Sequence, residues 1–229
     1  MKNYFTKTEC ILWLTSVTGI LLSFVLFDRQ NHLTLCASLI GVTSLIFAAK
    51  GNFIGPSLMI VFSVLYGIIS YDFAYYGEMI TYLGMTMPMS VMALVSWLKN
   101  PYQGNRAEVK VNRIDRREQV LMWGLTAAVT IVFYFILEFF ETANLLPSTI
   151  SVTTSFLAVY LTFRRSPYYA LAYAANDVIL ILLWTLASTE NSRYLSVVVC
   201  FVAFLFNDLY GFVSWKRMEL RQSEGRNAA

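Results

Sequence analysis

An amide and an acid stand side by side in a long apolar segment near the C-terminal end, at Asn176 and Asp177. On a helix, four residues of this segment share one face by i, i+3 and i+4 spacing: Tyr169, Tyr173, Asn176 and Trp184. The aromatic rings could stack on a flat ring, and the amide both donates and accepts hydrogen bonds. Asp177 points about 100° away and could instead pair with another helix. The pattern indicates a binding surface for a flat small molecule.

The same dipeptide recurs in the last apolar segment as Asn207 and Asp208, with Tyr210 on the stripe of the asparagine. An ionisable group inside a membrane span costs roughly 2.5–3.5 kcal/mol on insertion scales, so two such pairs need a reason. The side chains could line a substrate path, or they could hydrogen-bond neighbouring helices without touching a ligand. We expect Asn176 and Asn207 to line the path. The role of the two aspartates stays open between substrate contact and helix pairing.

Other candidates have an ordinary structural explanation beside the functional one. Tyr66 could form the opposite wall of a cavity, or it could simply pack between helices. Trp97 and Trp215 lie near the ends of their apolar segments, where an interfacial aromatic belt is the ordinary explanation and substrate contact the alternative. Glu78 precedes the fourth apolar segment, so we expect it in an outer loop without a chemical role.

The composition indicates that these residues are positioned by membrane-spanning helices. Of the 229 residues, 57% are hydrophobic and only 14% are charged, whereas a soluble domain has roughly 25% charged residues. A bilayer core of about 30 Å needs about 20 apolar residues per helix. On that scale the sequence predicts eight spans: Ile11–Phe27, His32–Ala49, Phe53–Tyr71, Met79–Leu98, Gln119–Phe139, Leu145–Phe163, Pro167–Ala187 and Tyr194–Trp215.

The basic residues support this number of spans. With the N-terminus inside, fifteen of the seventeen Lys and Arg residues fall on one side of the membrane, and only Arg29 and Arg193 fall on the other. Basic loop residues are retained in the cytoplasm, so we expect an integral protein of a bacterial cytoplasmic membrane with both termini inside. The longest polar stretch, 100–118, is then a basic cytoplasmic loop.

The two halves of the chain resemble each other weakly. The run WLTSVTGIL in the first span, from Trp13, is similar to WGLTAAVTI in the fifth span, from Trp123. Val-Ser-Trp ends both the fourth span, at Trp97, and the eighth, at Trp215. Four spans per half would give two copies with the same orientation, a parallel repeat about an axis along the membrane normal. Small transporters place substrate between such repeats near the midplane of the membrane.

Several functional classes find no support in the sequence. Three cysteines form no CxxC pair, and a single histidine, His32, cannot build a zinc site. We find no phosphate-binding loop, nucleophile elbow or soluble nucleotide-binding domain, so we expect neither an enzyme nor an ATP-driven pump, and no cofactor. The net charge of +3 is too small to argue for nucleic acid as a partner. Oligomeric state stays open.

The last two spans carry a resemblance to a known family. The runs SPYYALAYAANDVILILLW (166–184) and FNDLYGFVSWKR (206–217) resemble the PnuC transporters of bacteria. That resemblance implies an all-α fold of two parallel three-helix bundles joined by a linker helix. Mapped onto this chain, the parts are an N-terminal helix (1–31), the first bundle (32–98), the basic loop and linker helix (99–144), the second bundle (145–218) and a cytoplasmic tail (219–229).

The resemblance also implies a function. PnuC transporters are known for facilitated diffusion of nicotinamide riboside, a form of vitamin B3 that feeds NAD synthesis and is trapped inside by a cytoplasmic kinase. The family's site carries aromatics and an Asn or Asp on the helix that corresponds to the seventh span, which here offers Tyr169, Tyr173, Asn176 and Trp184. Many members have tryptophans where this chain has Ala170 and Tyr173. A carrier of thiamine or another vitamin, a proton-coupled symporter and a receptor that binds without transport are the alternatives.

Overall fold

The computed structural model of the chain describes residues 4–72, 75–142 and 144–227. Nearly all of them are helical, and a short antiparallel hairpin lies in the central polar stretch. The elements are α1 (Lys7–Phe27), α2 (His32–Ala49), α3 (Ile54–Asp72), α4 (Tyr76–Ile80), the π-helix η1 (Thr81–Thr86), α5 (Met87–Lys99), β1 (Pro101–Tyr102), β2 (Asn105–Val109), α6 (Arg116–Phe139), α7 (Leu145–Phe163), α8 (Tyr169–Ser188), the 3-10 helix η2 (Ser192–Tyr194) and α9 (Leu195–Asn227).

The prediction of eight membrane-spanning segments is confirmed. Within the described residues, eight helical segments are long and apolar enough to cross a membrane, and two of the predicted ranges, His32–Ala49 and Leu145–Phe163, agree at both ends. The largest difference lies at α9, which continues to Asn227; α1 begins four residues before its predicted start, at Lys7, and the fourth span begins three residues before, at Tyr76. The C-terminal part of α9 is polar, so hydropathy alone does not extend the predicted span beyond Trp215.

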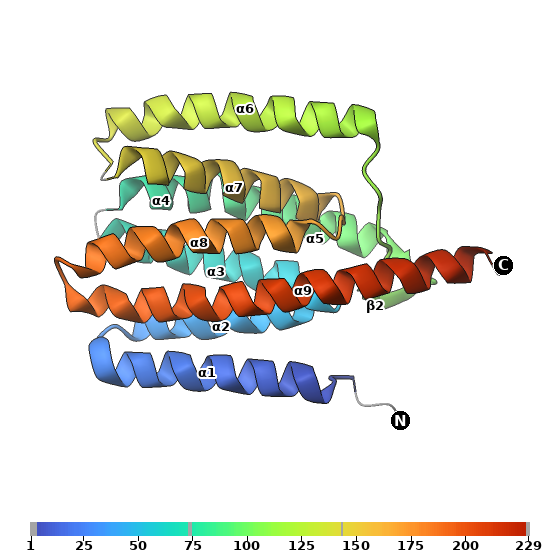
Figure 1. Cartoon of the computed structure of the whole chain (residues 1–229), viewed down its shortest axis with the longest axis horizontal. Helices are drawn as coiled ribbons and strands as arrows, with labels where there is room; N and C mark the ends of the chain where they lie inside the picture. Colours follow the sequence, from blue (N-terminus) through green and yellow to red (C-terminus); the bar gives the residue numbers. More distant parts are fainter. Residues whose placement is uncertain (1–3, 73–74, 143, 228–229) are drawn as a thin grey trace.

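Six helices form a closed ring. Each of α2, α3, α5, α7, α8 and α9 contacts the next, and α9 contacts α2 again. The helices α1 and α6 lie outside this ring, α1 against α2 and α9, and α6 against α7 (Figure 1). The protein is therefore an all-α membrane protein in which the ring encloses a common interior.

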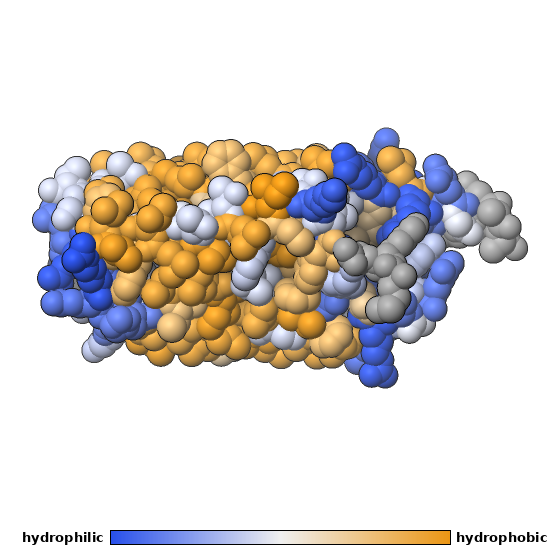
Figure 2. Space-filling model, turned by 90° about the horizontal axis from the view of Figure 1, so that it is seen from below, coloured by the Kyte–Doolittle hydropathy of each residue, from blue (hydrophilic) through white to orange (hydrophobic). Residues whose placement is uncertain are grey.

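The surface matches a bilayer environment. An apolar band covers the middle of the molecule, and hydrophilic residues gather at its two ends (Figure 2). Apolar side chains such as Ile11, Val120 and Phe135 are more than half exposed. Exposed apolar patches of this extent are unusual in soluble monomers and are typical of surfaces that contact lipid. Both chain termini lie at one end of the molecule, which we call the terminal end (Figure 1).

The fourth span is irregular. It consists of α4, the π-helix η1 and α5, with Pro88 in the first turn of α5. Proline has no N–H to donate, and its ring crowds the carbonyl of the residue four positions earlier, here Gly84 within η1. Single turns of π-helix are often found at functional sites. We expect this span to be the one that deforms most easily.

Candidate functional site

A polar layer crosses the ring interior at Asn176 of α8, which is 1% exposed. Its side-chain oxygen accepts hydrogen bonds from three hydroxyl groups of α7, at 2.9 Å from Thr154, 3.0 Å from Ser155 and 3.3 Å from Ser151. These hydroxyls repeat along one face of α7, so the helix presents a row of donors to α8. The amide is therefore held inside the ring, away from lipid.

Glu78 of α4 joins the same layer. It is 3% exposed, and Ser151 donates a hydrogen bond to its Oε1 at 3.3 Å. Its Oε2 has no hydrogen-bond partner among the described residues. The expected outer-loop location of Glu78 is wrong, because the fourth span begins three residues earlier than its apolar run. The sequence signal that could have found Glu78 is its i, i+4 spacing from Tyr82, which puts the two side chains on one helical face. Tyr82 is also buried.

The two aspartates meet at the interface between α8 and α9. The carboxyl groups of Asp177 and Asp208 interact with each other, and each residue is 3% exposed. The Oδ2 atom of Asp177 has no partner among the described residues. The interior therefore offers unsatisfied acidic oxygens.

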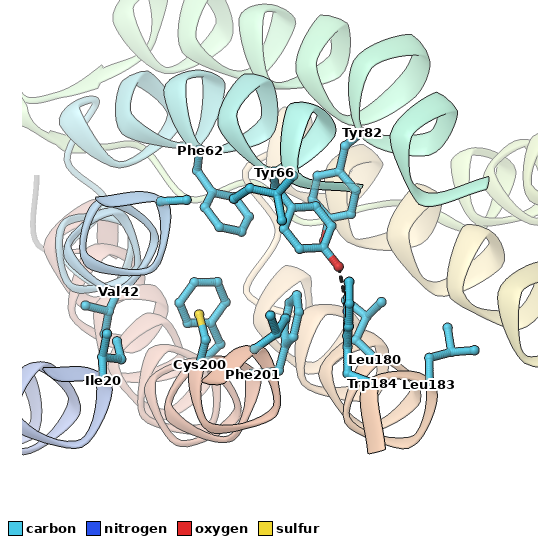
Figure 3. Close-up of a cluster of buried hydrophobic side chains, with 14 of the residues drawn as sticks. Ile20, Val42, Phe62, Tyr66, Tyr82, Leu180, Leu183, Trp184, Cys200 and Phe201 are labelled. Atoms are coloured by element: carbon cyan, nitrogen blue, oxygen red, sulfur yellow. Dashed lines mark hydrogen bonds between the residues drawn. The ribbon is translucent and has the colours of Figure 1, made fainter. Parts of the chain in front are cut away.

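Aromatic side chains fill the ring interior toward the end opposite the terminal end. The indole N–H of Trp184 donates a 2.7 Å hydrogen bond to the hydroxyl of Tyr66 (Figure 3). The ring centroid of Tyr66 lies 4.4 Å from that of Tyr82 and 5.6 Å from that of Phe201. The structure thus places Tyr66 of α3 opposite Trp184 of α8. Such rings can stack on a flat ligand, and their faces attract a cation.

A second aromatic group occupies the interior near the terminal end. The ring centroids of Trp97 and Trp215 lie 5.4 Å apart, and Tyr169 lies 5.0 Å from Trp215 and 6.1 Å from Tyr173. An interfacial belt does not describe Trp97 and Trp215, because they are 2% and 0% exposed. Their position at the ends of their spans is as predicted, but both indoles turn inward.

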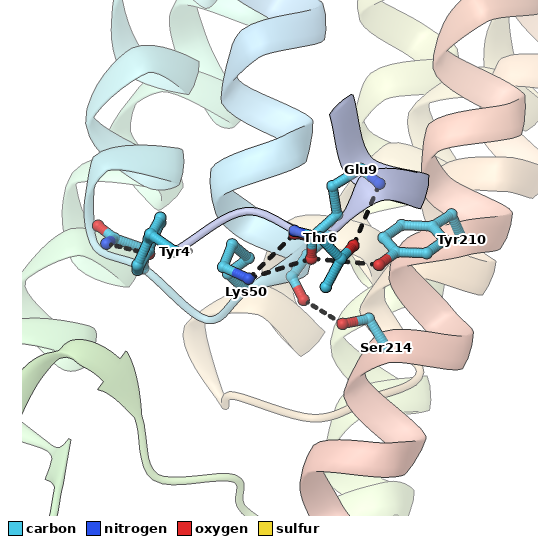
Figure 4. Close-up of polar contacts among 8 residues, drawn as sticks. Tyr4, Thr6, Glu9, Lys50, Tyr210 and Ser214 are labelled. Atoms are coloured by element: carbon cyan, nitrogen blue, oxygen red, sulfur yellow. Dashed lines mark hydrogen bonds and ion pairs between the residues drawn. The ribbon is translucent and has the colours of Figure 1, made fainter. Parts of the chain in front are cut away.

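Two predicted residues lie away from this interior. The Asn207 amide donates to Ser16 Oγ on α1 at 2.9 Å. The Tyr210 hydroxyl donates to Glu9 Oε1 on α1 at 3.1 Å (Figure 4). Glu9 also forms an ion pair with Lys50 at 3.1 Å. The stripe of α9 that carries Asn207 and Tyr210 thus faces α1 outside the ring, while Asp208 faces the interior.

The described part of the ring interior holds a small cavity. A cavity of about 20 Å³ lies between the polar layer and the terminal end, with Ser44, Ser90, Thr162, Tyr169 and Tyr173 among its lining residues. A cavity of this size holds about one water molecule. Side chains or helices must therefore move before a vitamin-sized molecule can occupy this cavity.

A ring of membrane-spanning helices around an aromatic and acidic interior is the architecture of a membrane transporter for a small molecule. The sequence profile of the nicotinamide mononucleotide transporter family matches residues 31–217, and the chain belongs to this family. The chain is also 26% identical, over 217 residues, to the nicotinamide riboside transporter PnuC of Neisseria mucosa, covering 93% of this chain and 82% of that protein.

A solved structure has the same fold. It is described as the crystal structure of the vitamin B3 transporter PnuC, with a TM-score of 0.83 and 24% sequence identity. The similarity covers 95% of this chain and 94% of that one. The resemblance seen in the last two spans is thus confirmed for the fold and for the family.

Proposed function

We propose that this protein carries nicotinamide riboside across the membrane by facilitated diffusion through the six-helix ring. One observation supports a substrate with a positively charged ring: the charged residues buried in the ring interior are the acids Glu78, Asp177 and Asp208, and no Lys, Arg or His is buried among the described residues. The pyridinium ring of the riboside carries a positive charge. An acidic interior lined with aromatic faces suits such a ring, with cation–π attraction of about 0.5–2 kcal/mol.

The same charges argue against the mononucleotide, which the family is named for. Its phosphate adds between about one and a half and two negative charges at neutral pH. Proteins bind phosphate with Arg, Lys or helix N-termini, and a buried anion without such partners is expensive. A phosphate beside three buried acids would lack compensation. We therefore assign the riboside, the substrate for which the Neisseria relative is named, rather than the phosphorylated form.

Each group has a role in this proposal. Trp184 and Tyr66 stack on the pyridinium ring, and Asn176 hydrogen-bonds the carboxamide or the ribose. Asp177 and Asp208 balance the positive charge of the ring. Tyr169 and Tyr173 lie on the path toward the terminal end. The two bundles, 32–98 and 145–218, move relative to each other so that the site opens to one side at a time.

Direction and trapping follow from charge. Thirteen basic residues that the structure describes lie at the terminal end, so we place this end and both termini in the cytoplasm of a bacterial cell. A cytoplasmic kinase would convert the riboside to its phosphate. Because the acidic interior disfavours the phosphate, the product could not return through the ring. Phosphorylation thus drives net uptake without coupling to an ion.

Counterflow in proteoliposomes tests the function. Vesicles loaded with unlabelled riboside should accumulate labelled riboside transiently, and a receptor that binds without transport should accumulate none. Unlabelled riboside should compete, whereas mononucleotide at the same concentration should not. Competition by thiamine as strong as that by riboside would instead favour the thiamine carrier. Uptake that stops when the pH gradient and the membrane potential are collapsed would favour proton-coupled symport.

A further inference from the structure

The Ser-Trp pairs at the ends of α5 and α9 make matching contacts across the two halves. Ser96 and Trp97 of α5 donate hydrogen bonds to the carbonyls of Phe163 and Thr162 at the end of α7, both at 2.9 Å. Ser214 and Trp215 of α9 donate to the carbonyls of Ala49 and Ala48 at the end of α2, at 2.7 Å and 2.8 Å. The hydroxyl thus satisfies the last carbonyl of the helix, and the indole adds a hydrogen bond to the preceding carbonyl, which also accepts a backbone N–H from Arg165 or Gly51 in the following turn.

These contacts join one half to the other on both sides of the ring. α5 belongs to the first half and α7 to the second, whereas α9 belongs to the second and α2 to the first. The indoles of Trp97 and Trp215 meet between the two contacts, and the small interior cavity lies directly behind them, lined by Ala48 and Thr162. The Val-Ser-Trp repeat in the sequence is therefore a repeated closure at the terminal end.

A strap of extended chain, residues 109–112, crosses both helix turns outside this closure. The backbone N–H of Val109 donates to the Gly51 carbonyl at 2.9 Å, and the N–H of Asn112 donates to the Arg165 carbonyl at 3.0 Å. Gly51 and Arg165 hold equivalent positions, two residues after α2 and after α7, and both have positive φ. One strap therefore bonds once to each half.

Gln222 on the extension of α9 fixes the middle of the strap. Its Oε1 accepts from the N–H of Val111 at 2.9 Å, and its Nε2 donates to the carbonyl of Val109 at 3.1 Å. The side chains of Val109 and Val111 are 2% and 8% exposed, in the same apolar cluster as Trp97 and Trp215. The strap thus seals the outer side of the tryptophan pair.

We propose that these parts form a gate at the terminal end: two matched Ser-Trp latches hold α5 to α7 and α9 to α2, the strap covers them, and both latches must release before substrate can leave the ring at this end. This inference rests on the proposed transport function. The central basic loop thereby has a mechanical role besides setting topology, because its residues 109–112 hold the gate closed.

A disulfide across one latch tests the gate. A Cβ added at Gly211 of α9 would lie 3.9 Å from the Cβ of Ala49 on α2 and 3.6 Å from the Cβ of Ala170 on α8. Both distances suit a disulfide, for which Cβ atoms lie about 3.5–4.5 Å apart. The pair Gly211→Cys with Ala49→Cys links the two halves. The pair Gly211→Cys with Ala170→Cys links α9 to α8 within one half and is the matched control.

Both pairs are made in a variant whose native Cys10, Cys36 and Cys200 are replaced by Ala. We expect the oxidised cross-half pair to lose riboside uptake at least about tenfold and to recover it on reduction, because a locked gate blocks every cycle. The control pair should change uptake by no more than about twofold on oxidation, since it leaves the latches free to open. Equal uptake by the two oxidised proteins, with both disulfides verified by mass spectrometry, would overturn the proposal.

A second measurement needs no substrate, so it separates failure of the gate from failure of the transport proposal. Val111→Cys in the same cysteine-free background is labelled with a membrane-impermeant maleimide, with Gln222 intact or replaced by Leu. Gln222→Leu removes both hydrogen bonds between Gln222 and the strap. It should raise the rate at which the introduced thiol at position 111 is labelled at least about fivefold, because each bond contributes on the order of 1 kcal/mol. Ser223→Ala is the control, since Ser223 donates only within its own helix, to Leu220. Unchanged labelling in Gln222→Leu would refute the strap as part of the gate.

Discussion

The two Asn-Asp dipeptides offer a matched test of which asparagine serves the substrate. Asn176 and Asn207 are both 1% exposed, and each precedes a buried aspartate. Asn176 lies in the ring interior, whereas Asn207 donates to Ser16 outside the ring. We therefore expect Asn176→Ala to weaken riboside binding and Asn207→Ala to leave it nearly unchanged.

The magnitude follows from the hydrogen bonds that Asn176 can make to the riboside. Removing one or two such bonds costs about 0.5–1.5 kcal/mol each, or about 1–3 kcal/mol where a polar ligand group is left unpaired in the buried site. Since 1.4 kcal/mol is a factor of about ten, the dissociation constant should rise by between about twofold and about 150-fold. For Asn207→Ala we expect a change within about twofold, as for a substitution without ligand contact.

The fold should survive the loss of Asn176. The hydroxyls that bond its oxygen can turn back to carbonyls of their own helix, since the Thr154 hydroxyl also lies 3.0 Å from the carbonyl of Ile150. Isothermal titration calorimetry in detergent gives the dissociation constants, and thermal unfolding of both variants checks that they are folded. Riboside binding by Asn176→Ala within twofold of wild type would refute the placement of the site, as would a larger loss for Asn207→Ala.

Three further predictions follow from individual contacts. Tyr66→Phe should destabilise the protein by about 1–3 kcal/mol in detergent unfolding, because the buried Trp184 indole N–H loses its acceptor; an unchanged unfolding midpoint would contradict that bond. Glu78→Gln should weaken riboside more than neutral nicotinamide, by about tenfold in competition assays, because only the riboside carries the charge that the acid balances; an equal loss for both ligands would exclude charge recognition by Glu78. Burial raises the pKa of Asp28, and nearby Arg193 only partly opposes this rise. The folded protein therefore binds the Asp28 proton more tightly than the unfolded chain does, and the stability gained from that proton is present at low pH and is lost as pH rises above the usual Asp range. Asp28→Asn should therefore flatten the fall in unfolding temperature between pH 4 and pH 7, and an unchanged slope would show that Asp28 does not contribute.

The sequence by itself determined the membrane class, the number of spans and the family. The length of each apolar segment and the distribution of Lys and Arg can be determined from the order of residues alone. They predict the topology because the bilayer sets the length of a span and basic loops are retained in the cytoplasm. The Val-Ser-Trp repeat at Trp97 and Trp215 was also visible in the sequence, but the contacts that it makes were not. The bundle boundaries and the roles of the site residues remain predictions.

Only the tertiary structure decided which side chains face one another. Helical spacing assigns Asn176 and Asn207 to a face, but both helices are apolar nearly all round, so their sequences do not tell whether that face meets the ring interior or a neighbouring helix. Glu78 joins the interior because α4 begins within a polar stretch, and Trp97 turns inward because the Thr162 carbonyl at the end of α7 accepts its N–H. Hydrogen bonds between segments distant in sequence have no local signature, which is why the interior and its closure required the folded chain.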